Sequence, residues 1–200
     1  MKAWHFVGET LRDGSPIPAD GVPLIFDDEP VLCVKGLHAS TDPFDALQYA
    51  PGDTLCYVDC QGEIERGVDK LVCTRRTIIR RMDAAEMLRY YARMQALSVI
   101  HLYPNDNDDV VFDYLMTGDE TLRSAAWSAT SSATSRAARS AACSATSSAA
   151  WSAARCAARI AARCAAESEE RSAAESEEHS AAYSAARADF NALVMECFGL

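Results

Sequence analysis

The chain has 200 residues, a formal net charge of −10 and a hydrophobic content of 49%. The excess of acid disfavours general binding to nucleic acids or to anionic membranes, because both carry negative charge themselves. No apolar run approaches the roughly 20 residues of a membrane span, and the first residues lack the apolar core of a signal peptide. These features predict a cytoplasmic protein of one or two domains.

The first part of the chain has an ordinary globular composition, with short apolar runs separated by turn residues. The segments predicted to be extended are residues 2–7, 22–26, 31–34, 36–40, 54–59 and 71–82. The second and third of these are expected to pair with each other around a turn at residues 27–30. Gly62 is expected to break the fifth strand before residues 63–65.

Helix signals follow the extended segments. Thr41 or Asp42 can cap a short helix that has Pro43 in its first turn. Asp83 is predicted to cap a longer helix over residues 84–102. The apolar side chains on one face of that helix are Met87, Leu88, Tyr91, Met94, Leu97 and Ile100.

The predicted domain organisation has three parts. Residues 1–105 form a small α+β head domain, which is long enough for one hydrophobic core. Residues 106–118 form a polar linker and a short helix that ends at Gly118. Residues 119–200 form a long tail rich in Ala and Ser. The expected fold class is therefore α+β, with a sheet-and-helix domain followed by an α-helical repeat tail.

A tetrapeptide repeat runs through the tail without an insertion from residue 124 to residue 187. The first position is usually Ser, the second and third are small, and the fourth varies. Ala, Arg and Glu are good helix formers, and no Gly or Pro interrupts the tail between Gly118 and Gly199. Opposite charges such as Arg163 and Glu167 lie four residues apart, as neighbours on a helix surface do. One long α-helix is the main interpretation.

A tetrapeptide-repeat solenoid is the alternative for the tail. Four residues exceed one helical turn by about 40°, so a stripe with this period circles a straight helix instead of following one face. A strict repeat is also typical of stacked coils that share one environment. A weaker period of sixteen residues, seen between residues 124–139 and 140–155, would suit a coil with four short faces.

Other residues are candidates for structure or for binding. The eight cysteines lack paired zinc-site spacing, so free structural thiols are expected and no metal is predicted. Trp127 and Trp151 occupy the variable position of their repeat units, and an interaction role is one interpretation because Trp is enriched in binding hot spots. Four arginines are interpreted as the solvated side of a strand end, with an acidic partner or phosphate as the alternative: Arg75, Arg76, Arg80 and Arg81.

The run CVKGLHASTDPFDALQYAPGDTLCYVDCQGEI, followed by DKLVCTRRTIIRRM, resembles an uncharacterised domain that is common in phages and prophages. That domain combines a GxHA strand, a PxDAxxY helix, a strand ending in Gly and a KxVxxxIxI strand, and its members often carry a Ser/Ala repeat tail. The resemblance covers residues 1–122. It implies a phage or prophage origin and no known reaction.

A second resemblance is to ADP-ribosyltransferases of the poly-ADP-ribose polymerase type, carried by Trp4–His5, residues 36–40, Tyr49 and residues 58–62. It implies that His5 holds the ribose of NAD, and that Tyr49 stacks on the nicotinamide. His38 stands where that family often has Tyr, and Phe6 replaces the family's glycine. The candidates for its catalytic glutamate are Glu63, Glu65 and Glu86.

Two functions are therefore expected. The first is a non-enzymatic, phage-type accessory protein in the host cytoplasm, whose head recognises a host or phage protein or a ligand. Its tail would act as a spacer or as the contact of a homo-oligomer. The alternative is an ADP-ribosyltransferase-like enzyme, or a degenerate relative, with NAD as its cofactor. A lone histidine on a strand is also commonly structural, so His5 and His38 have that simpler interpretation, and Tyr49 has one as a core residue.

Overall fold

The computed structural model describes residues 1–98, 100, 109–132, 145, 154, 156 and 174–200. The chain divides into two compact units. Unit 1 consists of Met1–Ala85 together with Cys197–Leu200, and unit 2 consists of Glu86–Glu196. Unit 1 contains an antiparallel sheet and a short helix, and the described part of unit 2 is helical, so the fold is mixed α+β.

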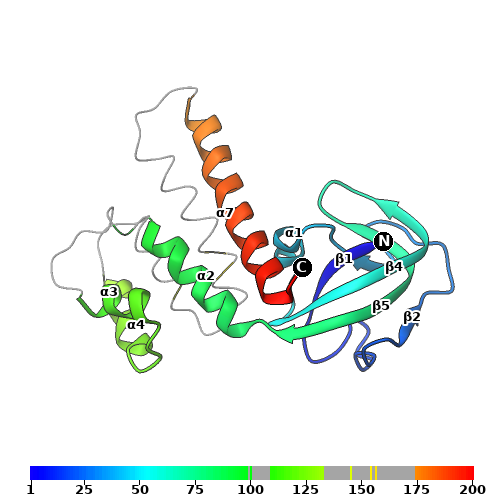
Figure 1. Cartoon of the computed structure of the whole chain (residues 1–200), viewed down its shortest axis with the longest axis horizontal. Coiled ribbons are helices and arrows are strands. Elements are labelled where there is room, and N and C mark those ends of the chain that lie inside the picture. Colours follow the sequence, from blue (N-terminus) through cyan, green and yellow to red (C-terminus); the bar gives the residue numbers. More distant parts are fainter. Residues whose placement is uncertain (99, 101–108, 133–144, 146–153, 155, 157–173) are drawn as a thin grey trace. The chain divides into compact units, whose positions relative to one another are not determined.

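Unit 1 is built on a long hairpin of two strands, as Figure 1 shows. The strands are β1 (Lys2–Val7), β2 (Pro23–Ile25), β3 (Leu37–Ala39), β4 (Thr54–Arg66) and β5 (Leu71–Asp83). All neighbouring strands are antiparallel, and the order is β1-β4-β5-β2, with β3 also on β5. Since β4 occupies one edge of β5, β2 and β3 lie end to end along its other edge.

The sheet closes on itself through the residue that follows β3. The backbone N–H of Trp4 donates to the carbonyl of Ser40 at 2.7 Å, and the N–H of Ser40 donates back to the carbonyl of Trp4 at 2.9 Å. The ring of strands therefore runs β1-β4-β5-β3 and returns to β1. Such a closed arrangement leaves an inner face that side chains must fill.

The inner face carries a core of small and medium apolar side chains. Its buried residues are Ala3, Val7, Ala39, Cys56, Val58, Cys60, Leu71, Cys73 and Ile78. Directly opposite residues on paired strands share a face, and His5 is opposite Cys56 while Arg76 is opposite Cys60. Both of these polar residues therefore lie on the inner face with the core.

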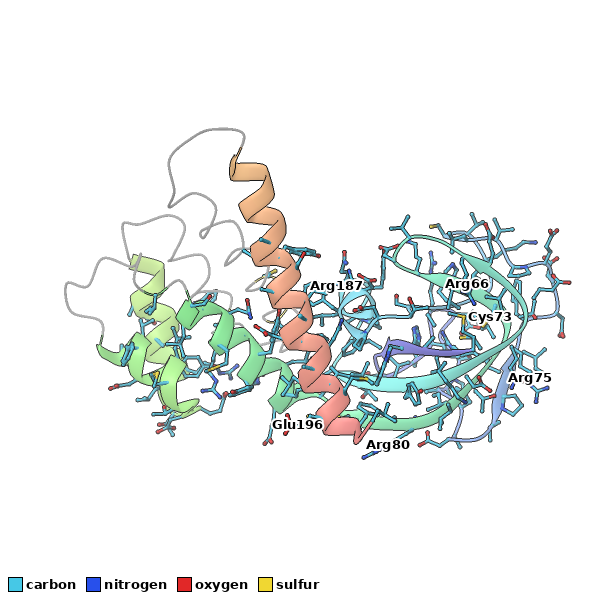
Figure 2. The ribbon with its side chains drawn as sticks, turned by 45° about the horizontal axis from the view of Figure 1, so that its top comes forward. Arg66, Cys73, Arg75, Arg80, Arg187 and Glu196 are labelled. Atoms are coloured by element: carbon cyan, nitrogen blue, oxygen red, sulfur yellow. The ribbon has the colours of Figure 1, made fainter. Side chains whose placement is uncertain are left out.

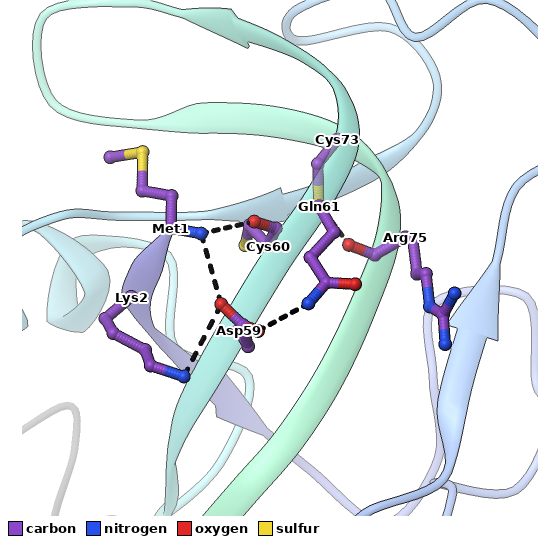
Figure 3. A network of polar contacts seen from close by, with 7 residues as sticks. All are labelled: Met1, Lys2, Asp59, Cys60, Gln61, Cys73 and Arg75. Carbon is purple, nitrogen blue, oxygen red and sulfur yellow. Dashed lines mark hydrogen bonds and ion pairs between the residues drawn. The ribbon is translucent and has the colours of Figure 1, made fainter.

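A polar network ties the start of β1 to β4 (Figure 3). Asp59 accepts hydrogen bonds from the amino group of Met1 at 3.1 Å and from Gln61 Nε2 at 2.7 Å, and the ammonium of Lys2 lies 3.5 Å away. The hydrogen bond from the Met1 amino group is the main reason that the pKa of Asp59 is lowered. The amino group also donates to the carbonyl of Cys60 at 2.6 Å.

The short helix α1 (Pro43–Gln48) begins as its sequence predicts. The side chain of Asp42 accepts a hydrogen bond from the N–H of Phe44 at 3.0 Å, and Pro43 stands in the first turn. This confirms Asp42 as the N-cap. Phe44 and Leu47 are buried, and the helix contacts β1.

Two predictions for unit 1 are wrong. Residues 31–34 do not form a strand paired with residues 22–26, because they fold into a tight turn in which the N–H of Val31 donates to the carbonyl of Lys35 at 2.9 Å. β2 pairs with the long strand β5 instead. Gly62 does not end β4, since its φ of +76° forms an irregularity inside one continuous strand.

Unit 2 contains α2 (Ala85–Ser98, whose first residue closes unit 1), α3 (Asp109–Thr117), α4 (Arg123–Ser132) and most of α7 (Ala174–Phe198). Asp83 Oδ1 accepts from the N–H of Ala85 at 2.9 Å, which confirms the predicted cap of α2. The buried hydroxyl of Tyr91 donates to the carbonyl of Ala186 at 2.9 Å, and its ring meets Phe190 edge-on.

The buried face of α2 is partly the predicted one. Its buried residues are Met87, Leu88, Tyr91, Ala92, Gln95 and Ala96, whereas Met94 and Leu97 are half-buried. The short helix predicted before Gly118 is confirmed as α3, and Gly118 follows it with a φ of +70°.

The tail is α-helical where it is described beyond single residues, at Arg123–Ser132 and Ala174–Phe198. Most of residues 133–173, and with them Trp151, lie outside the described residues. The single long helix and the solenoid therefore both stay predictions. Within the described part of the chain, no helix is both long enough and apolar enough to cross a membrane.

Candidate functional site

His38 is the centre of a polar cluster on unit 1. It lies on β3, and its Nε2 accepts a hydrogen bond from the backbone N–H of Cys33 at 3.0 Å. Its Nδ1 is 3.2 Å from the carbonyl oxygen of Gly36. A backbone N–H can only donate, so neutral His38 carries its proton on Nδ1 and donates it to Gly36.

Cys33 is held in an unusual backbone conformation beside this histidine. Its φ is 67°, which makes it the one residue other than Gly with a positive φ in the described part of the chain. A left-handed conformation costs a residue with a Cβ roughly 1–2 kcal/mol. The thiol of Cys33 is exposed, and its interaction with the ammonium of Lys70 helps to raise the pKa of that lysine, after the larger effect of Tyr49.

Lys70 connects Cys33 to a tyrosine and a carboxylate. Its Nζ donates to the hydroxyl of Tyr49 at 3.2 Å and lies 4.3 Å from the centre of that ring. The Tyr49 hydroxyl donates in turn to Asp69. The hydrogen bond to Asp69 is the main reason that the pKa of Tyr49 is raised, and the hydrogen bond to Tyr49 is the main reason that the pKa of Lys70 is raised.

Arg76 lies behind His38 on the inner face of the sheet. It is only 7% exposed, and its Nη1 donates to the carbonyl of His38. Burial lowers its pKa, yet a guanidinium stays protonated at neutral pH. Among the residues that the structure describes, no carboxylate forms an ion pair with Arg76, and the titratable groups that act on it are the thiols of Cys56, Cys60 and Cys73.

Positive charge accumulates around both histidines. The pKa of His5 is well below its usual value, first because of burial and then because of the charges of Arg76 and His38. The pKa of His38 is lowered first by burial and then by the charges of Lys70, Arg76 and Arg12. We refer to Arg12, His38, Lys70 and Arg76 as the cationic cluster.

Two of the interior thiols, those of Cys56 and Cys60, have raised pKa values. Burial raises the pKa of Cys56 to about 11. A hydrogen bond with Cys73, together with burial, raises the pKa of Cys60. A thiol with a raised pKa supplies little thiolate at neutral pH, so these cysteines act as small core side chains. No set of three or more His, Cys, Asp or Glu among the described residues could hold a metal ion.

The structure brings some of the predicted site residues together. His5 and His38 both experience the charge of Arg76, and Tyr49 reaches His38 through Lys70 and Cys33. Trp127, 45% exposed on α4, belongs to unit 2. Sequence reasoning missed the residues that complete the cluster, namely Arg12, Cys33, Asp69 and Lys70, since no motif marks them and only the strand topology assembles them.

The four arginines of β5 do not form one solvated face. Arg75 is exposed and Arg76 is buried, so the predicted solvated role is wrong for Arg76. Arg80 donates to the carbonyl of Phe198, and Arg81 pairs with Asp20 at 2.6 Å. Figure 2 shows Arg66, Arg75 and Arg80 spread along the hairpin.

Two of the candidate glutamates lie on the β4 side of the hairpin, away from the inner face. Glu63 and Glu65 are exposed and line a shallow hollow with Glu29 and Pro30, and Glu65 accepts from the N–H of Leu32 at 2.9 Å. The charges that act on His5 are those of Arg76 and His38. Within the described residues, no carboxylate is therefore placed to act on His5.

Comparisons with known proteins identify the domain that carries the cationic cluster. Residues 2–90 match a family model described as a domain of unknown function, DUF7666. The chain thus contains a DUF7666 domain that covers almost all of Met1–Ala85. No curated protein and no solved structure matches the chain.

Proposed function

We propose that the chain is a non-enzymatic accessory binding protein of a phage or prophage, acting in the host cytoplasm. Its DUF7666 domain binds an anionic group of a ligand or of a host or phage protein at the cationic cluster. Its repeat tail acts as a spacer or joins copies into an oligomer. The observation that carries the proposal is Arg76, a buried cation without an ion pair among the described residues.

The electrostatics of the cluster favour an anion. The pKa of His38 is lowered mainly by burial. Three positive charges lower it further, those of Lys70, Arg76 and Arg12. An anion placed among these charges would oppose that effect, because a nearby negative charge favours protonated histidine. Binding should therefore take up a proton near neutral pH. The positive cluster is a local exception on a chain whose net charge is −10.

Lys70 is the group that an incoming anion can reach. It is half-buried, carries three N–H donors and already reaches Tyr49 and Cys33. Arg12 is exposed, whereas Arg76 is almost fully buried and contributes positive electrostatic potential from the inner face of the sheet. The chemical class that fits is a phosphate or a carboxylate, which a charge-assisted hydrogen bond from Lys70 would hold.

Titration calorimetry with inorganic phosphate and pyrophosphate tests the proposal on the full chain. A hydrogen bond to a charged group contributes about 1.5–3 kcal/mol, so Lys70→Ala should weaken binding roughly 10- to 100-fold. Lys35→Ala is the matched control, since Lys35 is a cation of the same domain that pairs with Asp28 at 2.5 Å. Equal affinities of the two variants, or no anion binding at all, would contradict the proposal.

NAD binding is the second candidate. The cationic cluster suits a pyrophosphate, and Tyr49 is 50% exposed, which suits the stacking role that the resemblance to ADP-ribosyltransferases implies. That resemblance also assigns the ribose to His5. Calorimetry with NAD, ADP and pyrophosphate separates the candidates. An NAD affinity that exceeds that of pyrophosphate and falls in His5→Ala, at an unchanged melting temperature, would favour the NAD-binding enzyme.

A further inference from the structure

A row of three side chains crosses the face of the sheet opposite to the cationic interior. Trp4 on β1 is paired with Tyr57 on β4, and Tyr57 is paired with Arg80 on β5. Directly opposite residues share a face, so the three side chains lie side by side across three strands. The rings of Trp4 and Tyr57 are 4.8 Å apart. We call Trp4, Tyr57 and Arg80 the aromatic dock.

Phe198 fills this dock. It is 2% exposed, and its ring meets Trp4 edge-on at 4.9 Å and Tyr57 at 6.5 Å. Arg80 lies over the same ring at 5.3 Å and donates from Nη1 to the carbonyl of Phe198 at 2.6 Å. The dock therefore recognises both a side chain and the backbone of the segment that it holds.

The segment in the dock is the last turn of α7, and from Met195 onward Phe198 is its one buried side chain. Gly199 follows Phe198 with a φ of +64°, which ends the helix directly after the anchor. Cys197 and Leu200 on either side of the anchor are exposed. In the sequence, residues 86–196 separate this segment from the rest of unit 1. A single buried aromatic in a pocket is the usual hot spot of peptide recognition.

We propose that the aromatic dock binds the Phe198 segment of a second copy as well as its own. The segment is identical in every copy, so the same ring contacts and the same Arg80 hydrogen bond form in either case. Two chains that exchange ends close into a symmetric pair, because each supplies one dock and one segment. Each dock can hold its own segment or that of the other copy. Exchange is favoured when the protein concentration approaches the effective concentration of the attached segment.

Two full-length variants, each with one defective half, test the exchange without competition from the attached segment. Phe198→Ala keeps the dock and loses the anchor, whereas Tyr57→Ala keeps the anchor and damages the dock. We expect native mass spectrometry of an isotope-labelled mixture to show a mixed pair. The control mixture replaces Tyr57→Ala with the double variant Tyr57→Ala/Phe198→Ala, which leaves no anchor in either chain. A mixed pair no more abundant than in this control would overturn the proposal.

A peptide provides a second measurement. A synthetic peptide of residues 191–200 should bind full-length Phe198→Ala, and the same peptide with Ala at position 198 should bind at least tenfold more weakly. If Tyr57→Ala does not fold, Arg80→Ala replaces it, because Arg80 is exposed and contributes a hydrogen bond to the segment. Equal binding of both peptides, or binding of neither, would also overturn the proposal.

Discussion

The protonation state of the His38 ring affects the turn at residues 31–35, because the ring accepts a hydrogen bond from Cys33. In the neutral ring, Nε2 accepts a hydrogen bond from the N–H of Cys33, and Nδ1 donates one to the carbonyl of Gly36. A protonated imidazole has two donors and no acceptor, so protonation breaks the hydrogen bond from Cys33. The turn at residues 31–35 is thus best held when His38 is neutral. The lowered pKa of His38 also favours the neutral ring.

Stability should therefore fall as the pH falls through about 6.5. The folded-state pKa values of His5 and His38 are both below the ordinary histidine value of about 6.5, so the unfolded chain binds protons more readily in this range. Their contribution is complete above pH 6.5 and is lost as the pH drops below it. Urea unfolding at pH 8.0, 6.5 and 5.0 measures the effect.

The matched variant is His38→Gln, which keeps an acceptor for the N–H of Cys33 but does not titrate. Its free energy of unfolding should change less with pH than that of the wild type. The difference in slope corresponds to at most one proton bound on unfolding. A wild-type slope that is flat between pH 8.0 and 5.0, or equal to that of the variant, would contradict the role given to His38.

Two glycines of unit 1 differ in a way that isolates the cost of crowding within a strand. Gly62 and Gly21 both have a positive φ, of +76° and +81°. A Cβ at Gly62 would lie 2.1 Å from Thr74 Oγ1, which accepts a hydrogen bond from the N–H of Glu63 at 3.0 Å. A Cβ at Gly21 would meet nothing within 4 Å.

Gly21→Ala should therefore lose only the conformational preference of glycine, about 1 kcal/mol. Gly62→Ala adds the displacement of Thr74 and should cost about 2–3 kcal/mol. Thermal or urea unfolding of both variants measures the difference. Equal losses would mean that the hairpin relaxes around the new side chain.

Local sequence patterns predicted the elements of unit 1 well where short-range chemistry decides them. Alternation predicted β1, and Asp42 with Pro43 predicted the start of α1. The apolar run at residues 31–34 misled because burial and turn geometry are not visible in hydrophobicity alone. The backbone bridge between Trp4 and Ser40, which closes the sheet, is a long-range contact that no local sequence pattern predicts.

The candidate site was predictable only in part, for a related reason. His5, His38 and Tyr49 were named as candidates through the resemblance to ADP-ribosyltransferases, which rests on short local motifs. The pairing of β4 with β5 shifts twice, between Tyr57 and Val58 and between Gln61 and Ile64, and the pair Cys60–Arg76 lies between the two shifts. The inward side of β5 then changes along the strand, so simple alternation cannot assign it.

At the scale of the whole molecule, the last residues of the chain belong to the same unit as the first. A chain that ends at residue 105 lacks Phe198 but keeps the closed sheet and its inner core. It should therefore keep a cooperative thermal transition at a lower temperature than the full chain. Losing one buried Phe costs about 3–5 kcal/mol.

Differential scanning calorimetry of the truncated chain measures this, and full-length Phe198→Ala is the comparison. We expect both to melt below the wild type, because both leave Trp4 and Tyr57 uncovered. A truncated chain without any cooperative transition would show that residues beyond 105 are needed for the core of unit 1.

The charge pattern of the tail predicts that its two halves behave differently. Arg and Glu fill the fourth position over much of residues 152–188, where i,i+4 pairs add about 0.2–0.5 kcal/mol each to an Ala-rich helix. Over residues 120–151 Ser and Thr are frequent and such pairs are scarce, so a helix there needs packing. We expect a peptide of residues 152–188 to be substantially helical alone by far-ultraviolet circular dichroism. A peptide of residues 120–151 should gain helix only in an assembly, although α4 at Arg123–Ser132 is helical in the full chain. A β-type spectrum from either peptide would favour the solenoid over the helix.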